Sequence, residues 1–470
     1  MRGAPTVAAL TRRTALILTL LLLAAAALSV WRHIPFLTMI TAIAAVAVLP
    51  AFFKIERFIL FACFYIISFE IPLFKGELFP VSVNYYVLDA LYLLILFMFI
   101  GQISLRGRGV HKGTMFGWGF LLIFAVFGTS AFLGVYYGNS LPVLLKELRI
   151  LGYYGVFFAA VPFFGETRWI RWFFVIVVAG ALLAAFDTVY TYNALRLFRF
   201  YTRQVHVFLF VIPLLISLAI FDRHRLRRWF YAVAAVPVLT AVLISQTRGS
   251  WVGIAIAALL SITLSVWKRM RGRKRIAAFL SLSAVTLIVV LFAYRLMGGE
   301  SQARSEFTES RVQSVTELGT DYSMMMRVNS YMTVARKIQE RPLLGHGLGD
   351  TATYLFFGEY STQNNVDSTY LTILWKMGIL GLTAFLLLYT ALLIRAFRLY
   401  RTTDSSVHAV LSATVLAAFS GYLILGTISP VLITYRFNFF FGLVFAMIEA
   451  ISLREEQGIF SGKWRSLLSR

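Results

Sequence analysis

The chain has 470 residues, of which 59% are hydrophobic and only 14% are charged. Soluble domains are about half apolar and about a quarter charged, so this composition excludes an ordinary soluble protein. The net charge of +23 could indicate a nucleic-acid-binding protein. The basic clusters, however, are short and lie between apolar runs, as in membrane proteins. The single cysteine, Cys63, excludes an intrachain disulfide.

Apolar runs of about 18 residues or more recur along the chain and predict membrane spans. The runs are continuous rather than alternating, which favours helices over a β-barrel. We therefore expect an all-α integral membrane protein with about 12–14 transmembrane helices. The first run, Thr14 to Val30, is expected to be a span rather than a cleaved signal, because further spans follow at once. The spans begin near residues 14, 34, 58, 83, 115, 150, 173, 207, 230, 252, 277, 369, 408 and 432.

The charge distribution predicts that both termini are cytoplasmic. This orientation places 27 of the 44 Lys and Arg on the inside, in agreement with the positive-inside rule. The segment from Met297 to Ser368 then lies outside, with nine acidic against six basic residues. We accordingly expect N-terminal transmembrane helices over 1–296, a periplasmic loop domain over 297–368, and C-terminal transmembrane helices with a cytoplasmic tail over 369–470.

Within this long loop, the composition of Tyr322 to Arg341 predicts a helix with Met326, Tyr331 and Val334 on one apolar face. Pro342 is expected to end the helix, and Leu343 and Leu344 to bury the chain again.

The turn after this helix reads ERPLLGHGLGD and holds His346 between Gly345 and Gly347. The glycines allow a close backbone approach or a positive φ. An imidazole titrates near neutral pH and suits proton abstraction, although a lone histidine is more often a hydrogen-bonded loop residue.

Several cations are expected on the outer face, near the bilayer surface. Arg248, in SQTRGSW, ends a span against the positive-inside trend, and Arg327 lies on the loop helix. Lys146 and Arg149, in LLKELR, share one side of a helix, where Glu147 offers a local charge partner. Arginines 196, 199 and 203 lie in an aromatic stretch that also reads as an interfacial amphipathic helix. Guanidinium binds phosphate oxygens in pairs, so these residues point to a lipid-linked phosphate.

Other chemistries have no signal in the sequence. There is no phosphate-binding loop of the nucleotide hydrolases. The outer face has no Asp-x-Asp pair and no close cluster of His, Asp and Glu, so we expect no cofactor and no catalytic metal.

The segments SQTRGSW, RVNSYMTVARKIQERPLLGHGLGD and NNVDSTYLTILWKMGILGL together resemble the O-antigen ligase and polymerase superfamily. The resemblance is specific from about residue 240 to 385. Histidine between the two turn glycines is typical of the ligase branch and matches His346, and the family's essential arginines match Arg248 and Arg327. Many members have His-Asn where this chain has Val366-Asp367, so Asp367 is assigned to orienting a base or the acceptor.

The resemblance implies a glycosyltransferase of the bacterial inner membrane with a periplasmic active site. We expect the reaction to be metal-independent, because the outer face lacks a ligand cluster, and inverting, because no carboxylate is placed to act as a nucleophile. The donor would be an O-antigen on undecaprenyl diphosphate, and the acceptor a hydroxyl of the lipid A–core oligosaccharide. His346 would be the base. Arg248 and Arg327 would stabilise the leaving diphosphate, and substrate contacts would come from Lys146, Arg149, Arg203 and Asp367.

Three alternatives stay open. An O-antigen polymerase or a protein O-oligosaccharyltransferase would use the same donor. A secondary transporter would have as many spans, with Asp89, Asp187 and Lys376 as interior ionisable candidates. A structural membrane scaffold would not need arginines that oppose the positive-inside trend.

Overall fold

The computed structural model describes residues 55–68, 72–77, 82–106, 114–195, 205–269, 322–356, 359–433 and 435–468. The spans expected near residues 14, 34 and 277 lie outside these residues, as do Arg196, Arg199 and Arg203. The described chain is mostly helical, as predicted, with two short antiparallel hairpins that the sequence analysis did not predict.

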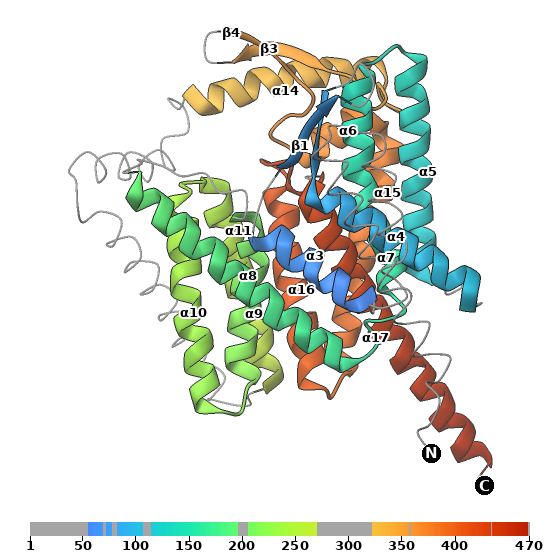
Figure 1. Ribbon diagram of the computed structural model, residues 1–470, viewed down its shortest axis with the longest axis vertical. Coiled ribbons are helices and arrows are strands. Elements are labelled where there is room, and N and C mark those ends of the chain that lie inside the picture. Colours follow the sequence, from blue (N-terminus) through green and yellow to red (C-terminus); the bar gives the residue numbers. More distant parts are fainter. Residues whose placement is uncertain are drawn as a thin grey trace, which may run out of the picture.

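The first half of the chain forms helices that lie side by side or cross in front of one another (Figure 1). In chain order its elements are α3 (Ile55–Ser68), β1 (Pro72–Glu77), β2 (Ser82–Tyr86), α4 (Val87–Arg106), α5 (Met115–Tyr136), α6 (Leu141–Gly152), η2 (Tyr153–Gly155), α7 (Val156–Ala160), α8 (Thr167–Ala194), α9 (Val205–Phe221), α10 (Arg225–Ile244) and α11 (Arg248–Arg269). Strands β1 and β2 pair antiparallel from Pro72–Tyr86 to Glu77–Ser82, with one irregularity between Pro72 and Phe74.

The second half places one helix and one hairpin outside the bundle before returning to it. Its elements are α14 (Tyr322–Glu340), β3 (Ala352–Phe356), β4 (Glu359–Gln363), α15 (Thr369–Thr402), α16 (Ser406–Leu425), η3 (Val431–Ile433) and α17 (Tyr435–Leu468). Strands β3 and β4 pair antiparallel from Ala352–Gln363 to Phe356–Glu359. Helix α14 lies across one end of the bundle, with this hairpin above it (Figure 1).

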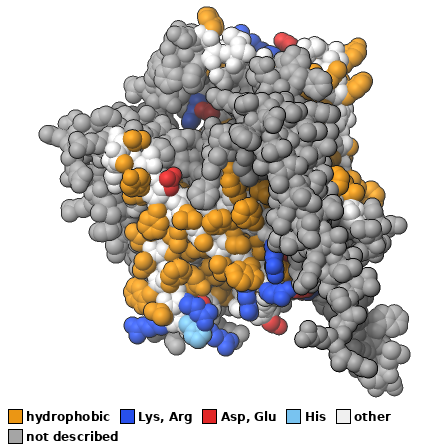
Figure 2. Space-filling model, in the orientation of Figure 1, with side chains coloured by type: hydrophobic (Ala, Val, Ile, Leu, Met, Phe, Trp, Pro, Cys, Tyr) orange, Lys and Arg blue, Asp and Glu red, His pale blue; other side chains and the backbone are white. Residues whose placement is uncertain are grey.

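Seven of the described helices are long and apolar enough to cross a membrane: α5, α8, α10, α11, α15, α16 and α17. Figure 2 shows the matching surface, a broad band of hydrophobic side chains bordered on one side by Lys and Arg. The span expected near residue 150 is different. It consists of α6, η2 and α7 in succession, and the residues at their junctions keep right-handed helical dihedrals.

Helix α17 forms the centre of the bundle. The side chains from Phe439 to Ile448 are almost completely buried, in a stretch dominated by phenylalanine. For example, Phe445 makes edge-on ring contacts with Phe116 and Phe120 of α5 and with Tyr389 of α15. Aromatic rings of this size bury large apolar areas, so α17 holds the other helices around it.

One end of the bundle is strongly basic. Lys268, at the end of α11, donates to the carbonyl groups of Tyr400 and Thr403, and Arg269 donates to that of Asp222. These contacts bring the ends of α9, α11 and α15 together. We call this the basic end; its Lys and Arg are Arg168, Arg171, Arg223, Arg225, Arg227, Arg228, Lys268, Arg269, Arg398, Arg401 and Arg454.

The opposite end carries α14, and we call it the α14 end. Tyr331 and Val334 of this helix pack with Tyr354 of β3 and with Val366 and Trp375 around the start of α15. The prediction of a helix with an apolar face that Pro342 ends is therefore confirmed, although the side chain of Met326 lies outside the described residues.

The prediction that Leu343 and Leu344 bury the chain again is wrong. Their side chains are 65% and 44% exposed, and the close contact at this point is made by the backbone of the turn. A Cβ atom on Gly378 of α15 would lie 2.2 Å from the Leu343 carbonyl oxygen.

Candidate functional site

The turn that follows α14 is hydrogen-bonded to a break in α15. Gly378 interrupts α15 with φ 63° and ψ −168°. In an unbroken helix the carbonyls of Trp375 and Lys376 would accept from the N–H groups four residues on, those of Ile379 and Leu380. Here they accept from His346 N (2.9 Å) and Gly347 N (3.0 Å).

The N–H groups released by the same break also find partners in the turn. Ile379 N donates to the Pro342 carbonyl at 2.8 Å, and Leu380 N donates to that of Leu343 at 3.4 Å. The turn and the broken helix thus satisfy each other's backbone groups. Irregular backbone inside a membrane protein is tolerated only where other protein groups complete its hydrogen bonds.

Gly347 is required for both of the reasons that the sequence analysis gave. Its φ is +81°, and an added Cβ would lie 2.4 Å from the backbone nitrogen of Gly134 in α5. The turn is fixed to the end of α5 by two more contacts. Leu348 N donates to the Ser130 carbonyl at 2.9 Å, and the Asn139 side chain donates to the His346 carbonyl at 2.8 Å. His346 therefore lies on a turn held between α5 and α15.

The imidazole of His346 is oriented by α14. Its Nε2 lies 2.7 Å from the Lys337 carbonyl oxygen. Because a carbonyl can only accept, Nε2 carries the proton in this arrangement, and Nδ1 of the neutral ring keeps its lone pair. The nearest carboxylate oxygen to Nδ1 is Oδ2 of Asp350, at 3.9 Å, and the side chain of His346 is 12% exposed. The ring can thus accept a proton at an atom next to an acidic group.

Asp350 is the centre of a small polar network. Its Oδ2 accepts from Lys337 Nζ and from the indole N–H of Trp375, each at 2.7 Å. Burial opposes ionisation of this carboxyl group, but these hydrogen bonds and the nearby cations outweigh it and lower the pKa of Asp350. The side chain therefore stays an anion beside the imidazole at neutral pH.

A buried ion pair connects the turn to α6. Nζ of Lys376, whose side chain is 2% exposed, lies 2.9 Å from Glu147 Oε1 and also donates to the Asp350 carbonyl. The other carboxylate oxygen of Glu147 accepts from Gly349 N at 2.8 Å, and Asn364 donates to Oε1 at 3.1 Å. Glu147 is thus the partner of α15 and the turn, rather than of the cations next to it in the sequence.

Arg327 and Asp367, two predicted site residues, form an ion pair with each other. Nε of Arg327 lies 3.1 Å from Asp367 Oδ2, and the Tyr331 hydroxyl donates to the Asp367 carbonyl at 2.6 Å. The pair lies at the start of α15 and is partly exposed. Ten residues separate Arg327 from Lys337 on α14, which corresponds to about 15 Å along the helix axis. Arg327 is therefore not in contact with His346.

Arg248 is the first residue of α11, and its side chain lies outside the described part of the chain. Its backbone position is known from its neighbour, because a Cβ atom on Gly249 would lie 2.6 Å from Ile428. Ile428 belongs to the loop between α16 and η3. This loop also contacts the start of α15, since Thr369 N donates to the Gly426 carbonyl at 2.8 Å. The first turns of α11 and α15 therefore lie close together, on the Arg327–Asp367 side of the α14 end.

The two remaining described residues of the predicted site, Lys146 and Arg149, have different surroundings. Lys146 is exposed on α6, whereas Arg149 lies 3.4 Å from Asp89 of α4 and is already paired. Within the described residues the predicted set therefore forms two groups, His346 with its polar network and Arg327 with Asp367. Arg248 is placed near the second group by its backbone.

Sequence reasoning missed the residues that hold the turn. Lys337, Asp350 and Trp375 were not singled out, Lys376 was noted only as an interior charge, and Glu147 was assigned to the wrong partner. The available signal was the Trp-Lys pair just before Gly378, inside an otherwise apolar span.

Residues 233–386 match a protein-family model described as O-antigen ligase. The match runs from α10 to α15 and includes the positions of Arg248, Arg327, His346 and Asp367. No curated protein matches the chain.

Proposed function

We propose that this chain, which belongs through residues 233–386 to the O-antigen ligase superfamily, is a membrane glycosyltransferase of the bacterial inner membrane. It moves a glycan from undecaprenyl diphosphate to a hydroxyl group of the lipid A–core oligosaccharide. The α14 end faces the periplasm and the basic end faces the cytoplasm. The gathering of Lys and Arg at one end of the bundle supports this orientation through the positive-inside rule.

In this proposal His346 is the general base. The acceptor oxygen attacks the anomeric carbon, its proton passes to Nδ1 of His346, and the bond to the diphosphate breaks with inversion. Asp350, which lies 3.9 Å from Nδ1, stabilises the imidazolium that forms. The hydrogen bond from Nε2 to the Lys337 carbonyl keeps the ring in the tautomer that can accept at Nδ1.

The leaving diphosphate is stabilised by Arg248 and Arg327. Asp367 holds Arg327 through Nε, which leaves the outer N–H groups of the guanidinium to face phosphate oxygens. The donor diphosphate binds at the start of α11 and α15, and its first sugar extends along α14 towards His346. Exposed Lys146 is an additional cation for substrate phosphate.

The observation that carries the proposal is the placement of His346. The imidazole lies inside the segment that matches the family, in a fixed tautomer, beside an anion, and at the end opposite the basic one.

The test is transfer by the purified protein from a lipid-diphosphate glycan to lipid A–core. His346→Ala should lower the rate by about 10²–10⁴ while donor binding persists, because a positioned base contributes that factor. Arg248→Lys and Arg327→Lys should also lower the rate, since ammonium lacks the planar fork of guanidinium. Arg336→Lys, on the exposed face of α14, is the matched control and should retain activity. Wild-type transfer by His346→Ala would refute the base assignment.

Two further measurements separate the alternatives. A deletion strain with unmodified lipid A–core and glycan accumulating on its carrier indicates a ligase, whereas single-repeat glycan on lipid A–core indicates a polymerase. Transfer that is unaffected by EDTA supports metal-independent chemistry, and loss of activity that Mg²⁺ restores would contradict it.

A further inference from the structure

A guanidinium is stacked on an aromatic ring beside the His346 turn. Arg341 directly follows α14, and its Cζ lies 3.6 Å from the ring centroid of Tyr137. Tyr137 comes directly after the last residue of α5, and its ring meets that of Tyr136 edge-on, with the centroids 5.4 Å apart. Both tyrosine rings are exposed. We call the side chains of Arg341, Tyr136 and Tyr137 the Arg341 platform.

The platform is hydrogen-bonded to the turn that carries His346. The Lys337 carbonyl oxygen accepts from Arg341 N at 3.3 Å and lies 2.7 Å from His346 Nε2. Gly345 N in turn donates to the Arg341 carbonyl at 3.1 Å. On the α5 side, the Asn139 side chain donates to the His346 carbonyl at 2.8 Å. A single carbonyl oxygen thus lies between the Arg341 backbone and the imidazole, so the platform is built next to the proposed base.

The charge of Arg341 is not neutralised in the way that the neighbouring cations are. Nζ of Lys337 lies 2.7 Å from Asp350 Oδ2, and Nζ of Lys376 lies 2.9 Å from Glu147 Oε1. Within the described residues, no carboxylate lies at ion-pair distance from the Arg341 guanidinium. Its observed side-chain contact is with the ring of Tyr137.

Stacking leaves the binding edge of the Arg341 guanidinium open. The plane of the guanidinium contacts the ring, so the N–H groups around its edge remain available. Arginine uses this edge to bind phosphate or carboxylate oxygens two at a time. The adjacent carboxylate, that of Glu340, is directed to the imidazole instead, with Oε2 3.6 Å from His346 Nε2. Arg341 can therefore bind an external anion close to His346.

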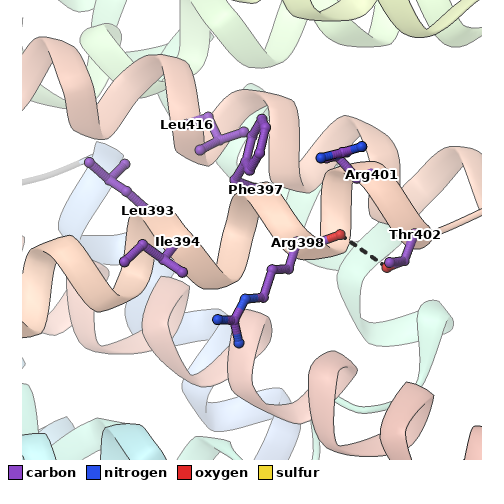
Figure 3. A pocket seen from close by; sticks show the side chains of 7 residues that line it. All are labelled: Leu393, Ile394, Phe397, Arg398, Arg401, Thr402 and Leu416. Atoms are coloured by element: carbon purple, nitrogen blue, oxygen red, sulfur yellow. Dashed lines mark hydrogen bonds between the residues drawn. The ribbon is translucent and has the colours of Figure 1, made fainter.

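The groove between α15 and α16 at the basic end provides a contrast (Figure 3). There, Cζ of Arg401 lies 5.9 Å from the ring centroid of Phe397, too far for close stacking. The Glu455 carboxylate lies 3.4 Å from the hydroxyl of Thr402, which lines the same groove. That carboxylate would oppose an external anion, whereas Arg341 is both closely stacked and without a carboxylate partner in the described chain.

Exposed apolar side chains next to the platform indicate that lipid reaches it. Leu343 and Leu344 of the turn are exposed, and so are Ile379 and Leu380 of α15. The backbones of the two pairs are joined, since Leu380 N donates to the Leu343 carbonyl. Exposed apolar patches on a membrane protein contact lipid. A glycan anchored in the adjacent leaflet can therefore reach the Arg341 platform.

We propose that the Arg341 platform binds an anionic sugar of the acceptor glycan, a pyranose that carries a phosphate or a carboxylate group. The Arg341 guanidinium holds the anionic group, and the exposed ring of Tyr136 packs against the C–H face of the sugar. This inference rests on the proposed glycosyl transfer and names the part of the acceptor that is recognised. The donor diphosphate is assigned to Arg327, which precedes Arg341 by about 21 Å of helix rise. The acceptor therefore approaches His346 from the other end of α14.

The experiment measures acceptor binding separately from transfer. Full-length protein in phosphatidylcholine nanodiscs is titrated with core oligosaccharide released from lipid A by mild acid, either untreated, phosphatase-treated or carboxyl-reduced. Arg341→Gln should bind the untreated oligosaccharide about 10-fold more weakly than the wild type, because it loses hydrogen bonds to a charged group. One of the two treatments should weaken binding to the wild type by a similar factor and have no effect on Arg341→Gln. The treatment that does so identifies the anionic group as phosphate or carboxylate.

Matched variants separate this site from the general charge of the α14 end. Arg336→Gln removes an exposed guanidinium from the same helix and should bind like the wild type. Tyr137→Leu should weaken binding, because the guanidinium loses the ring that orients it. Tyr137→Phe keeps that ring and should retain binding.

Three outcomes would overturn the proposal. Equal binding of all three oligosaccharides by the wild type would show that no anionic sugar is recognised. Equal loss in Arg341→Gln and Arg336→Gln would show attraction to general charge. Binding that disappears from the wild type in phosphatidylglycerol nanodiscs would assign Arg341 to a phospholipid head group instead. A wild type that shows the expected binding pattern but no transfer would refute the proposed function and leave this site standing.

Discussion

The ion pair between Glu147 and Lys376 should control how firmly the His346 turn is held. Glu147→Gln keeps the size of the side chain but removes the anion. Glu147 Oε1 accepts from Lys376 at 2.9 Å, and Oε2 accepts from Gly349 N at 2.8 Å. A carboxamide has one acceptor oxygen, so it cannot serve both donors, and its NH₂ group faces one of them.

The size of the effect follows from burial. The side chains of Lys376 and Glu147 are only 2% and 12% exposed, so solvent screens the pair little. Removing one member of a buried pair costs about 3–5 kcal/mol, since the other charge stays without compensation. We expect the free energy of opening the turn to be about 3 kcal/mol smaller in Glu147→Gln than in the wild type. This difference corresponds to roughly 150-fold more frequent opening.

Hydrogen exchange of the amides from residue 345 to 349 measures this opening directly. Glu147→Gln should exchange faster there, and Glu166→Gln, which breaks the exposed pair with Arg168, should not. Lys376→Met should also accelerate exchange. The double variant should exchange more slowly than the two single effects would give together, because neither buried charge remains. Exchange at the wild-type rate in Glu147→Gln would refute the reasoning.

Three further predictions concern the same end of the molecule. Gly347→Ala should lower thermal stability and transfer activity, because its φ of +81° costs an L-residue about 1–2 kcal/mol and the added Cβ would lie 2.4 Å from Gly134. Gly152→Ala is the control that should keep wild-type stability and activity, since Gly152 has a φ of −58° and open space around its Cβ position. Since the pKa of Asp350 is lowered, its contribution to stability is complete above the ordinary aspartate pKa of about 3.9 and is lost as the pH falls through the lowered value. Asp350→Asn should therefore flatten the acid limb of a thermal-stability profile against pH, and an unchanged limb would contradict this role. Asp367→Asn should leave the fold intact but weaken binding of the lipid-diphosphate donor, because the partly exposed Arg327 then loses the partner that orients it. Donor binding equal to wild type would argue against that role.

The sequence predicted the features that depend on local composition. Apolar run length predicted the long helices, and helix-forming composition followed by Pro342 predicted α14. The close approach and positive φ of Gly347 were also expected, because glycine is the residue that tolerates both. The separation of basic residues to one end of the bundle followed from counting Lys and Arg between spans.

The sequence did not predict which distant polar groups form hydrogen bonds or ion pairs with each other. The break at Gly378 looks like an ordinary glycine in an apolar span, and its role depends on a turn some 30 residues earlier in the chain. Glu147 was expected to neutralise a helical neighbour, but its partner Lys376 is 229 residues away. Leu343 and Leu344 were expected to be buried as apolar residues, but the close contact at this point is made by their backbone.

The sequence by itself determined that this chain is a helical membrane protein, which end of the bundle carries its positive charge, and where one histidine lies on a glycine turn. These properties follow from how each segment interacts with water, lipid or its own neighbours along the chain. Only the tertiary structure decided that His346 lies beside Asp350, that Arg327 pairs with Asp367, and that Lys376 anchors the turn to α6. Buried polar groups must find partners where water is excluded, and the packing of distant helices decides which partners are within reach.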